Sequence, residues 1–199
     1  MQPTLILASA STTRAKLLRA AAIDIEPVPA RLDEAAMTQA MLDEGATPRD
    51  LSDVLADRKA RKVSARYPDR LVLGCDQVLS IGDRVFGKPE TPQAATTQLQ
   101  TLRNTTHQLH SAAVLYREAA PVWRHVDVVS LTMRHFSDAY LHGYVQRNWH
   151  EIRHCAGAYQ LESEGARLFT RISGDYFSVL GLPLLPLLDY LIAAEVIES

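Results

Sequence analysis

The residue with the clearest chemical potential is Asp76, which follows the short apolar run at 71–75. Such a run, with a β-branched residue and polar neighbours on both sides, predicts a strand buried on both faces of an α/β sheet. We expect Asp76 at or just past the carboxyl end of that strand, where open α/β sheets usually bind ligands. An aspartate in this place can also simply cap a turn. Glu34, next to Asp33, becomes a metal ligand only if the fold brings it to Asp76.

A hydroxyl-rich turn at 9–13 is suited to holding an anion. It begins at Ser9 and lies between a predicted strand and a predicted helix that starts at Arg14. The free N–H groups of a first helical turn point at an anion in this position, and Arg14 adds charge-assisted bonds. Ser11 or Thr12 can equally be an ordinary helix cap. The turn lacks the glycines of a P-loop, which excludes that motif.

Lys88 and Lys59 can each be interpreted either as a phosphate-binding residue or as an ordinary solvent-exposed one. Lys88 stands in the tripeptide Gly87-Lys88-Pro89, where glycine lets the backbone pass close to a ligand and proline fixes the loop. Taken alone, the tripeptide favours an exposed turn. Lys59 lies in a basic stretch of a predicted long helix, whose charged side chains are mostly solvated. Spacing alone gives it no special role.

The stretch His150-Glu151-Ile152-Arg153-His154 matches the zinc-protease pattern of two histidines four residues apart with a glutamate between them. In the extended form of the pattern the third ligand falls on Gln160, and an amide is a poor zinc ligand. Small residues directly after His154 indicate that the helix is already ending, whereas both histidines need one continuous helix. A zinc protease is therefore the least favoured reading. It requires one tightly bound zinc per chain and peptide cleavage that is lost on His150→Ala.

The elements that position these residues follow from the hydrophobic pattern. It predicts strands at 4–8, 24–29, 71–77, 78–81, 106–116 and 122–136, and helices at 14–22, 47–67, 91–103, 137–149 and 182–195. The segment 31–34 is expected to be a loop. This mixture, without repeats or a linker, predicts an α/β fold with a mixed central sheet, in which a long hairpin forms a second lobe.

Composition narrows the class of protein. With 47% hydrophobic residues among 199, the chain can build a core without a disulfide or metal staple, and a net charge of −2 argues against a nucleic-acid interface. Cys75 and Cys155 suit two free thiols in a reducing compartment. The start of the chain lacks the basic region of a signal peptide, and no apolar run is long enough to span a membrane. We therefore expect a cytoplasmic protein with no nucleic-acid or membrane partner.

Seven short motifs, taken in order, resemble those of the Maf family of nucleoside triphosphate pyrophosphatases. They are Leu7-Ala8-Ser9-Ala10-Ser11-Thr12-Thr13-Arg14, Leu32-Asp33-Glu34, Leu55-Ala56-Asp57-Arg58-Lys59-Ala60, Gly74-Cys75-Asp76-Gln77, Gly87-Lys88-Pro89, Ala156-Gly157-Ala158-Tyr159, and Gly174-Asp175-Tyr176 with Val179-Leu180-Gly181-Leu182-Pro183. Each motif alone is weak, but their order over nearly the whole chain is specific. The resemblance implies one Maf-like domain over residues 1–199 without a separate linker. It also implies a two-lobed fold like that of inosine triphosphate pyrophosphatases, with the active-site cleft between the lobes.

The resemblance further implies a reaction: hydrolysis of a nucleoside triphosphate to the monophosphate and pyrophosphate, as housecleaning of non-standard nucleotides. A divalent metal cation, magnesium or manganese, and a possible homodimer come with it. Asp76 would be the general base or water-positioning acid, and Glu34 would bind the metal with Asp76. The phosphates would be held by Ser9, Arg14, Lys59 and Lys88.

Three positions shape base selection in the family, and here they are Thr13, Gln77 and Glu162. Gln77 and the stretch at 154–157 resemble the branch that acts on 7-methylguanosine triphosphate. Glu162 also fits, because a carboxylate can accept from the N1–H and amino group of guanine. Thr13 fits neither this branch nor the branch that hydrolyses dTTP and UTP, and Thr12 replaces the usual proline. The alternatives are a dTTP and UTP pyrophosphatase, or a nucleotide-sensing regulator of cell division without turnover.

Overall fold

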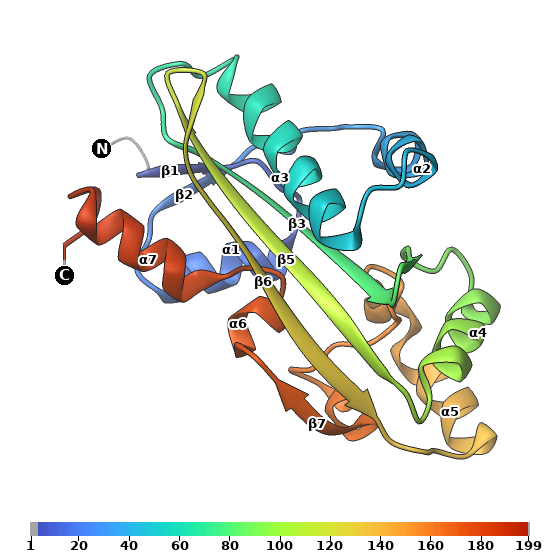
Figure 1. Ribbon diagram of the computed structural model, residues 1–199. Coiled ribbons are helices and arrows are strands. Elements are labelled where there is room, and N and C mark those ends of the chain that lie inside the picture. Colours follow the sequence, from blue (N-terminus) through green and yellow to red (C-terminus); the bar gives the residue numbers. More distant parts are fainter. Residues whose placement is uncertain (1–3, 199) are drawn as a thin grey trace. The chain divides into compact units, whose positions relative to one another are not determined.

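The computed structural model describes residues 4–198, which form a mixed α/β fold (Figure 1). Within this range seven strands make one sheet in the hydrogen-bonded order β2-β1-β3-β5-β6-β7, and β4 pairs with β3. The strands are β1 (Leu5–Leu7), β2 (Ile25–Pro27), β3 (Val72–Ile81), β4 (Arg84–Phe86), β5 (Thr106–Arg117), β6 (Ala120–Met133) and β7 (Phe169–Ser173). The β1–β2 and β1–β3 pairs are parallel and the β3–β4 and β6–β7 pairs are antiparallel. The predicted mixed sheet is therefore confirmed.

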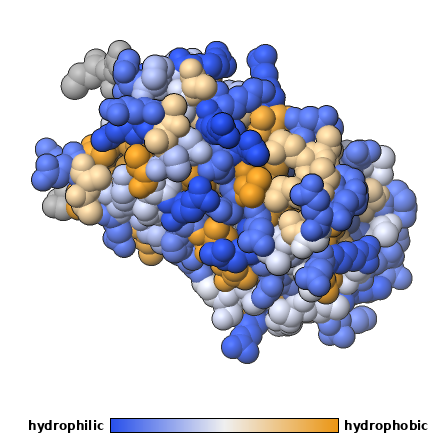
Figure 2. Space-filling model, turned by 45° about the horizontal axis from the view of Figure 1, so that its top comes forward, coloured by the Kyte–Doolittle hydropathy of each residue, from blue (hydrophilic) through white to orange (hydrophobic). Residues whose placement is uncertain are grey.

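The helices alternate with the strands along the chain. They are α1 (Thr12–Ala20), α2 (Glu34–Asp43), α3 (Pro48–Ser64), α4 (Pro92–Leu102), α5 (Asp138–Ile152), α6 (Tyr176–Val179) and α7 (Leu184–Ala193), with a short 3₁₀ turn, η1, at Glu164–Leu168. None of the helices in residues 4–198 is long and apolar enough to cross a membrane. The face shown in Figure 2 is mainly hydrophilic, and its hydrophobic side chains form separate patches.

The chain divides into two compact units, each assembled from segments that are far apart in sequence. Within the described range, unit 1 comprises 4–77, 110–127 and 175–198, and unit 2 comprises 78–109 and 128–174. Strands β3, β5 and β6 each contribute residues to both units.

Helices cover both faces of the sheet in unit 1. Successive residues of a strand point to opposite faces, so β1 and β3 each serve two hydrophobic clusters. Leu73 and the other buried residues on its face of the sheet pack against α1 and α7. Val72 and the buried residues on the opposite face pack against α3 (Figure 1). The first cluster includes Leu5, Leu7, Leu18, Leu73, Cys75, Leu115, Leu187 and Leu191. The second includes Ile6, Ala8, Ala56, Ala60, Val63, Val72, Ala112 and Val114.

Helix α3 lies unusually close to β3 because Gly74 has no side chain. A Cβ atom at Gly74 would lie 2.2 Å from the carbonyl oxygen of Ala56 and 2.6 Å from the amide nitrogen of Ala60. Real side chains do not tolerate such distances, so only glycine permits this approach. It brings Lys59, which precedes Ala60, over the face of β3 that carries Asp76.

The sequence predicts the start of a helix well where a capping side chain precedes it and the helix has a buried face. Thr47 accepts from the Asp50 N–H at 3.1 Å, and Pro48 takes the first helical position of α3. Helix α2 is the exception: residues 31–33 are the expected loop, but Glu34 already begins a helix that the sequence did not predict. Asp33 caps that helix and Glu34 is its first residue. No residue of α2 is buried, so hydrophobic periodicity gave no signal for it.

In unit 2, Glu164 of η1 accepts hydrogen bonds from three residues of α5. Its carboxylate accepts from Arg147 at 2.6 Å, from Asn148 at 2.8 Å and from Tyr140 at 3.3 Å. The bond from Arg147, followed by that from Asn148, lowers the pKa of Glu164 to about 2. The carboxylate therefore stays charged in any solution near neutrality and holds η1 against α5.

Candidate functional site

Asp76 lies in the middle of β3 rather than at its end. The sequence predicts a strand end near Gln77, but β3 runs unbroken from Val72 to Ile81. The neighbouring strand β1 is the one that ends here, because it pairs with β3 only as far as Leu73. Asp76 is therefore just past the carboxyl end of β1, on a continuing strand. A buried acid is tolerated there because a cation compensates its charge.

That cation is Lys59, which holds two carboxylates at once. Its Nζ atom lies 2.6 Å from Asp76 Oδ1 and 3.0 Å from Glu34 Oε1. Lys59 and Asp76 are both buried, whereas 45% of the Glu34 side chain is exposed. Glu34 therefore joins a buried ion pair from the solvent side. Three predicted site residues from α2, α3 and β3 meet at one point.

Burial raises the pKa of the Asp76 carboxyl above its usual value. The positive charges of Lys59 and Arg14 pull the pKa down, but burial outweighs them. A carboxylate whose pKa is raised toward neutrality is a better proton acceptor than an ordinary aspartate. Asp76 Oδ1 is bonded to Lys59, so Oδ2 is the oxygen available to accept a proton.

Arg14 is a buried cation whose guanidinium ties three pieces of unit 1 together. It donates to the carbonyl oxygen of Gly181 at 2.7 Å, to the carbonyl oxygen of Cys75 at 3.1 Å and to Ser9 Oγ at 3.3 Å. Within residues 4–198 it has no carboxylate within ion-pair distance, although its charge acts on Asp76. A buried guanidinium without a bonded counter-ion suits an anionic ligand.

The turn before α1 lies between a strand and a helix, as the sequence predicts. Ser11 is the N-cap and its side chain accepts from the Arg14 N–H at 3.3 Å. Ser9 Oγ accepts from the Ser11 N–H at 3.2 Å and from Arg14. Ser11 is therefore the ordinary cap, while Ser9 bonds Arg14, whose charge acts on Asp76. Thr13, half-buried, is in the first turn of α1.

Glu34 and Asp76 are the residues that would hold a divalent cation. The Lys59 ammonium brings the two carboxylates to one place, and carboxylate oxygen is the ligand that Mg²⁺ and Mn²⁺ prefer. Among the described residues no group of three or more acids, histidines or cysteines is placed to hold a metal. One or two carboxylates completed by phosphate oxygens and water is the usual Mg²⁺ arrangement in sites that bind nucleotides.

Gln77 points away from Asp76, to the opposite face of β3, where its side-chain amide meets α6 and β5. Its Nε2 atom donates to Ser111 Oγ at 2.9 Å and to the carbonyl oxygens of Ser178 and Val179, both at 3.0 Å. Nothing in the sequence predicts this network, because Ser111 and Ser178 look like ordinary small polar residues.

Lys88 and Glu162 belong to unit 2, where both are exposed. Burial raises the pKa of the Cys155 thiol in the same unit; the charge of Glu162 raises it further and that of Lys88 lowers it. Burial also raises the pKa of Cys75 to about 11. Neither cysteine is therefore a ready nucleophile near neutral pH. The predicted cleft between the lobes stays a prediction.

The zinc-protease pattern does not form a zinc site. Helix α5 ends at Ile152, so His150 lies in its last turn and His154 lies beyond it. The two histidines do not share a continuous helix, which confirms the expectation from the small residues that follow. The absence of a metal-binding cluster in residues 4–198 agrees with this.

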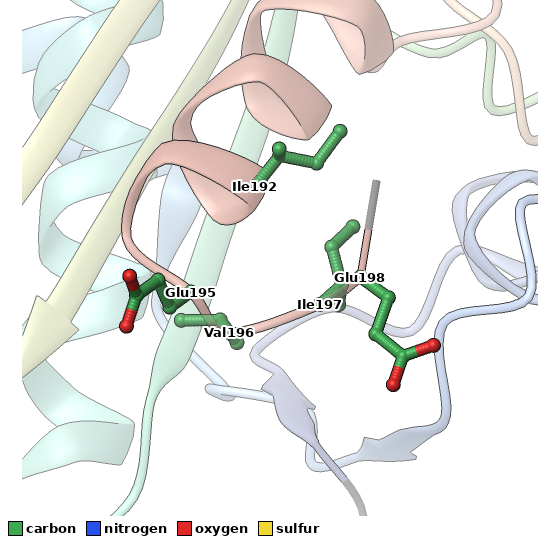
Figure 3. A pocket seen from close by; sticks show the side chains of 5 residues that line it. All are labelled: Ile192, Glu195, Val196, Ile197 and Glu198. Carbon is green, nitrogen blue, oxygen red and sulfur yellow. The ribbon is translucent and has the colours of Figure 1, made fainter.

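A hollow of about 350 Å³ at the end of α7 is unrelated to these residues. Figure 3 shows that Ile192, Val196 and Ile197 form its apolar part, with Glu195 and Glu198 extending in opposite directions. Its two charged groups are both carboxylates. It is therefore unsuited to a phosphate.

The mixed α/β fold, with buried cations beside two carboxylates, is typical of a protein that handles phosphorylated ligands. The chain belongs to the Maf family, because the family model described as "Maf-like protein" matches residues 4–194.

Similar proteins cover nearly the whole chain. It is 52% identical to a nucleoside triphosphate pyrophosphatase of Ruegeria sp. (strain TM1040), over 100% of both chains, and 56% identical to one of Roseobacter denitrificans, over 96% of each. It is 46% identical to a 7-methyl-GTP pyrophosphatase of Mesorhizobium japonicum, over 94% of each. A HAM1 protein from Coxiella burnetii matches in structure with a TM-score of 0.40 and 16% identity, over 65% of this chain and 72% of that chain.

Proposed function

We propose that this protein is a pyrophosphatase that hydrolyses a nucleoside triphosphate to the monophosphate and pyrophosphate. The observation that carries the proposal is Lys59, held between Asp76 and Glu34 with Arg14 close by. Relatives at 51–56% identity bear the name nucleoside triphosphate pyrophosphatase, which supports the same activity. A sensor without turnover would not need a carboxylate placed beside the proposed phosphate-binding cations Lys59 and Arg14.

In the proposed reaction Asp76 accepts the proton of a water molecule that attacks the α-phosphorus. Its Oδ2 atom is the acceptor, because Lys59 holds Oδ1. Lys59 and Arg14 neutralise negative charge that builds on the triphosphate, and Ser9 donates to a phosphate oxygen. Lys88 would act on the outer phosphates as a point charge.

A divalent cation, magnesium or manganese, is part of the proposal. Glu34 and Asp76 would hold it, and it would supply charge neutralisation on the phosphate oxygens and a lower pKa for bound water. We also propose that the protein serves to remove non-standard nucleotides and that it works as a homodimer.

The proposed substrate is 7-methyl-GTP. Relatives at 43–46% identity bear the name 7-methyl-GTP pyrophosphatase. Gln77 and Glu162 also resemble the residue types of this branch of the family at the two positions. Glu162 is exposed, so its carboxylate is accessible to accept from a guanine and tolerates a cationic methylated ring. Thr13 does not add to this support, and a dTTP or UTP pyrophosphatase is the second candidate.

Pyrophosphate release tests the function and the substrate together. The purified protein is assayed with 7-methyl-GTP, GTP, UTP, dTTP and CTP, each with Mg²⁺ or Mn²⁺ and each again with a chelator. We expect release that depends on the metal, with the highest kcat/KM for 7-methyl-GTP. Preference for UTP or dTTP would move the chain to the other branch. Tight nucleotide binding without release would favour the sensor and overturn the proposal.

Lys59→Met should shift the pH dependence of the reaction upward as well as slow it. Activity requires ionised Asp76, so the rate falls when the pH drops below the pKa of that carboxyl. Lys59 lowers this pKa, and its removal should therefore move the acid limb of kcat/KM to higher pH.

The matched control is Lys62→Met, one turn along the same helix, where the exposed ammonium donates only to the Arg31 carbonyl oxygen. It should leave the acid limb in place. An acid limb that stays put, or moves to lower pH, in Lys59→Met would show that Asp76 is not the titrating base.

A further inference from the structure

A second hollow, of about 340 Å³, is formed by the loop that follows β2 and by the C-terminal end of α3. All of the residues that line it belong to unit 1, and none of them is proposed to handle the triphosphate. They are Pro27, Val28, Pro29, Ala30, Arg31, Lys62 and Arg66. Small-molecule sites have volumes of about 300–1,000 Å³ and combine an apolar wall with a few polar groups. This hollow has both.

The walls of the hollow are built on the packed part of unit 1. Ala30 is buried in the cluster beneath α3, and Val28 packs against the same cluster. The Val28 N–H donates to the Leu7 carbonyl oxygen at 2.9 Å, next to the β1–β2 pairing. Lys62 Nζ donates to the Arg31 carbonyl oxygen at 2.8 Å and ties the loop to α3. Both walls are therefore in place before a ligand binds.

Three cations, Arg31, Lys62 and Arg66, line the hollow, and no acid lines it. In the part of the chain that the structure describes, none of the three has a carboxylate within ion-pair distance. The ammonium of Lys62 donates to a backbone carbonyl, and the guanidinium of Arg66 lies over the Tyr67 ring, 5.6 Å from its centre. Stacking on a ring leaves the N–H donors at the edge of a guanidinium group available to a ligand.

The acids next to these cations in the sequence are engaged elsewhere. Glu26, just before the lining segment, accepts from Arg70 at 3.5 Å. Glu34, just after it, pairs with Lys59 at 3.0 Å, and Asp33 caps α2. These three carboxylates therefore do not neutralise the charge of the hollow.

Arg31 has a left-handed backbone conformation, with φ at +49°. This conformation is uncommon for a residue with a large side chain, and strained backbone of this kind clusters at ligand sites. Here it accompanies the hydrogen bond from Lys62 to the Arg31 carbonyl oxygen, while the arginine itself lines the hollow. The conformation thus brings a second cation to the side of Lys62.

We propose that this hollow binds the phosphomonoester group of a small organic molecule, whose ring lies on the apolar wall at 27–30. A phosphomonoester carries about 1.5 to 2 negative charges at pH 7 and three acceptor oxygens, so it can meet all three cations. A carboxylate has one charge and two oxygens. Guanidinium groups bind phosphate oxygens through paired N–H bonds, and Lys62 adds a point charge. The hollow has room for on the order of ten water molecules, so it can hold the ring as well as the phosphate.

Phenyl phosphate is the probe, because it joins one phosphomonoester to one flat apolar ring. When ¹⁵N-labelled full-length protein is titrated with it, the amide resonances of Val28, Ala30 and Arg31 should move together and saturate. Inorganic phosphate, which lacks the ring, should bind the same place about 10-fold more weakly. Phthalate, with a ring and two carboxylates, should also bind more weakly than phenyl phosphate.

Three outcomes of these titrations would overturn the proposal. Equal affinity for inorganic phosphate would mean that the apolar wall takes no part. Tighter binding of phthalate would mean that the hollow prefers carboxylates. Resonances that move only at Asp76 and its neighbours would place the probe among the residues proposed for hydrolysis. Since the measurement is binding at the amides of the hollow, its result does not depend on whether the protein releases pyrophosphate.

Two variants remove a charge and leave the walls in place. Arg31→Asn introduces a residue that tolerates the left-handed conformation, and Arg66→Met keeps an apolar stem. Each should raise the dissociation constant of phenyl phosphate by about 10-fold.

Arg61→Met is the matched control, because it removes the same charge from the neighbouring exposed position of α3, outside the hollow. It should leave the dissociation constant unchanged. Equal weakening in Arg61→Met, Arg31→Asn and Arg66→Met would show that the probe is attracted to basic surface in general. An unchanged dissociation constant in both Arg31→Asn and Arg66→Met would remove the two guanidinium groups from the site. Either result would overturn the proposal.

Discussion

Asp76→Asn should lower kcat by about 10²- to 10⁴-fold, the usual contribution of a positioned general base. Asparagine has the same shape, and its Oδ1 atom can still accept from Lys59. The site should therefore keep its geometry while Oδ2, the proton acceptor, is replaced by an NH₂ group that cannot take a proton. Nucleotide binding depends on Arg14, Ser9, the lysines and the proposed cation, for which Glu34 and the remaining amide oxygen are still ligands, so it should change less than turnover.

Steady-state pyrophosphate release gives kcat, and calorimetry with a non-hydrolysable triphosphate analogue and Mg²⁺ gives the dissociation constant. Asp57→Asn is the control, because Asp57 is on α3 but bonds Tyr116 and Arg124 rather than the site. It should retain nearly full turnover. Full turnover in Asp76→Asn would remove Asp76 from the catalytic role. Equal losses of turnover and of nucleotide affinity would make it a binding residue instead.

The buried part of the fold could be predicted from the sequence because packing leaves a periodic pattern. Helix α3 was predicted with its Thr47 cap, and β5 was predicted to within a residue. Gly74 and Lys59 were singled out by the order of the family-like motifs rather than by hydrophobic periodicity. The pairing of Lys59 with Asp76 depends on α3 lying against β3, a contact between segments that are 17 positions apart. Spacing along the chain does not encode it.

The remaining differences have specific physical causes. Helix α2 buries nothing, so it left no hydrophobic period to read. Asp76 was expected at a strand end because it follows a short apolar run, but the strand continues through it and Lys59 compensates the charge of the buried acid. The hydrogen bonds of Gln77 come from α6 and β5, more than 30 positions away. A glutamine read in sequence has two possible amide orientations, and only its neighbours in the fold select one.

Gly74→Ala should destabilise the protein and disable the site together. The new Cβ would lie 2.2 Å from the Ala56 carbonyl oxygen and 2.6 Å from the Ala60 amide nitrogen. Both atoms are backbone, so no side-chain rotation relieves the clash and α3 must move away from β3. Overpacking of this kind costs about 1–3 kcal/mol or more. For a domain of this size that is a fall in Tm of roughly 2–12 °C. Because Lys59 precedes Ala60, the same movement should draw its ammonium from Asp76 and lower kcat.

Thermal unfolding and pyrophosphate release on the same samples check both effects. Gly87→Ala is the matched control for stability, because a Cβ there meets nothing within 4 Å. It should leave Tm nearly unchanged.

The double variant Gly74→Ala with Ala60→Gly removes the Ala60 Cβ, which is 2.8 Å from the new atom, but leaves both backbone contacts. It should therefore not restore stability. Recovery in the double variant would mean that side chains alone set the spacing between α3 and β3. A Gly74→Ala protein as stable and active as the original would show that α3 can move without disturbing Lys59, and the structural basis for pairing Lys59 with Asp76 would fail.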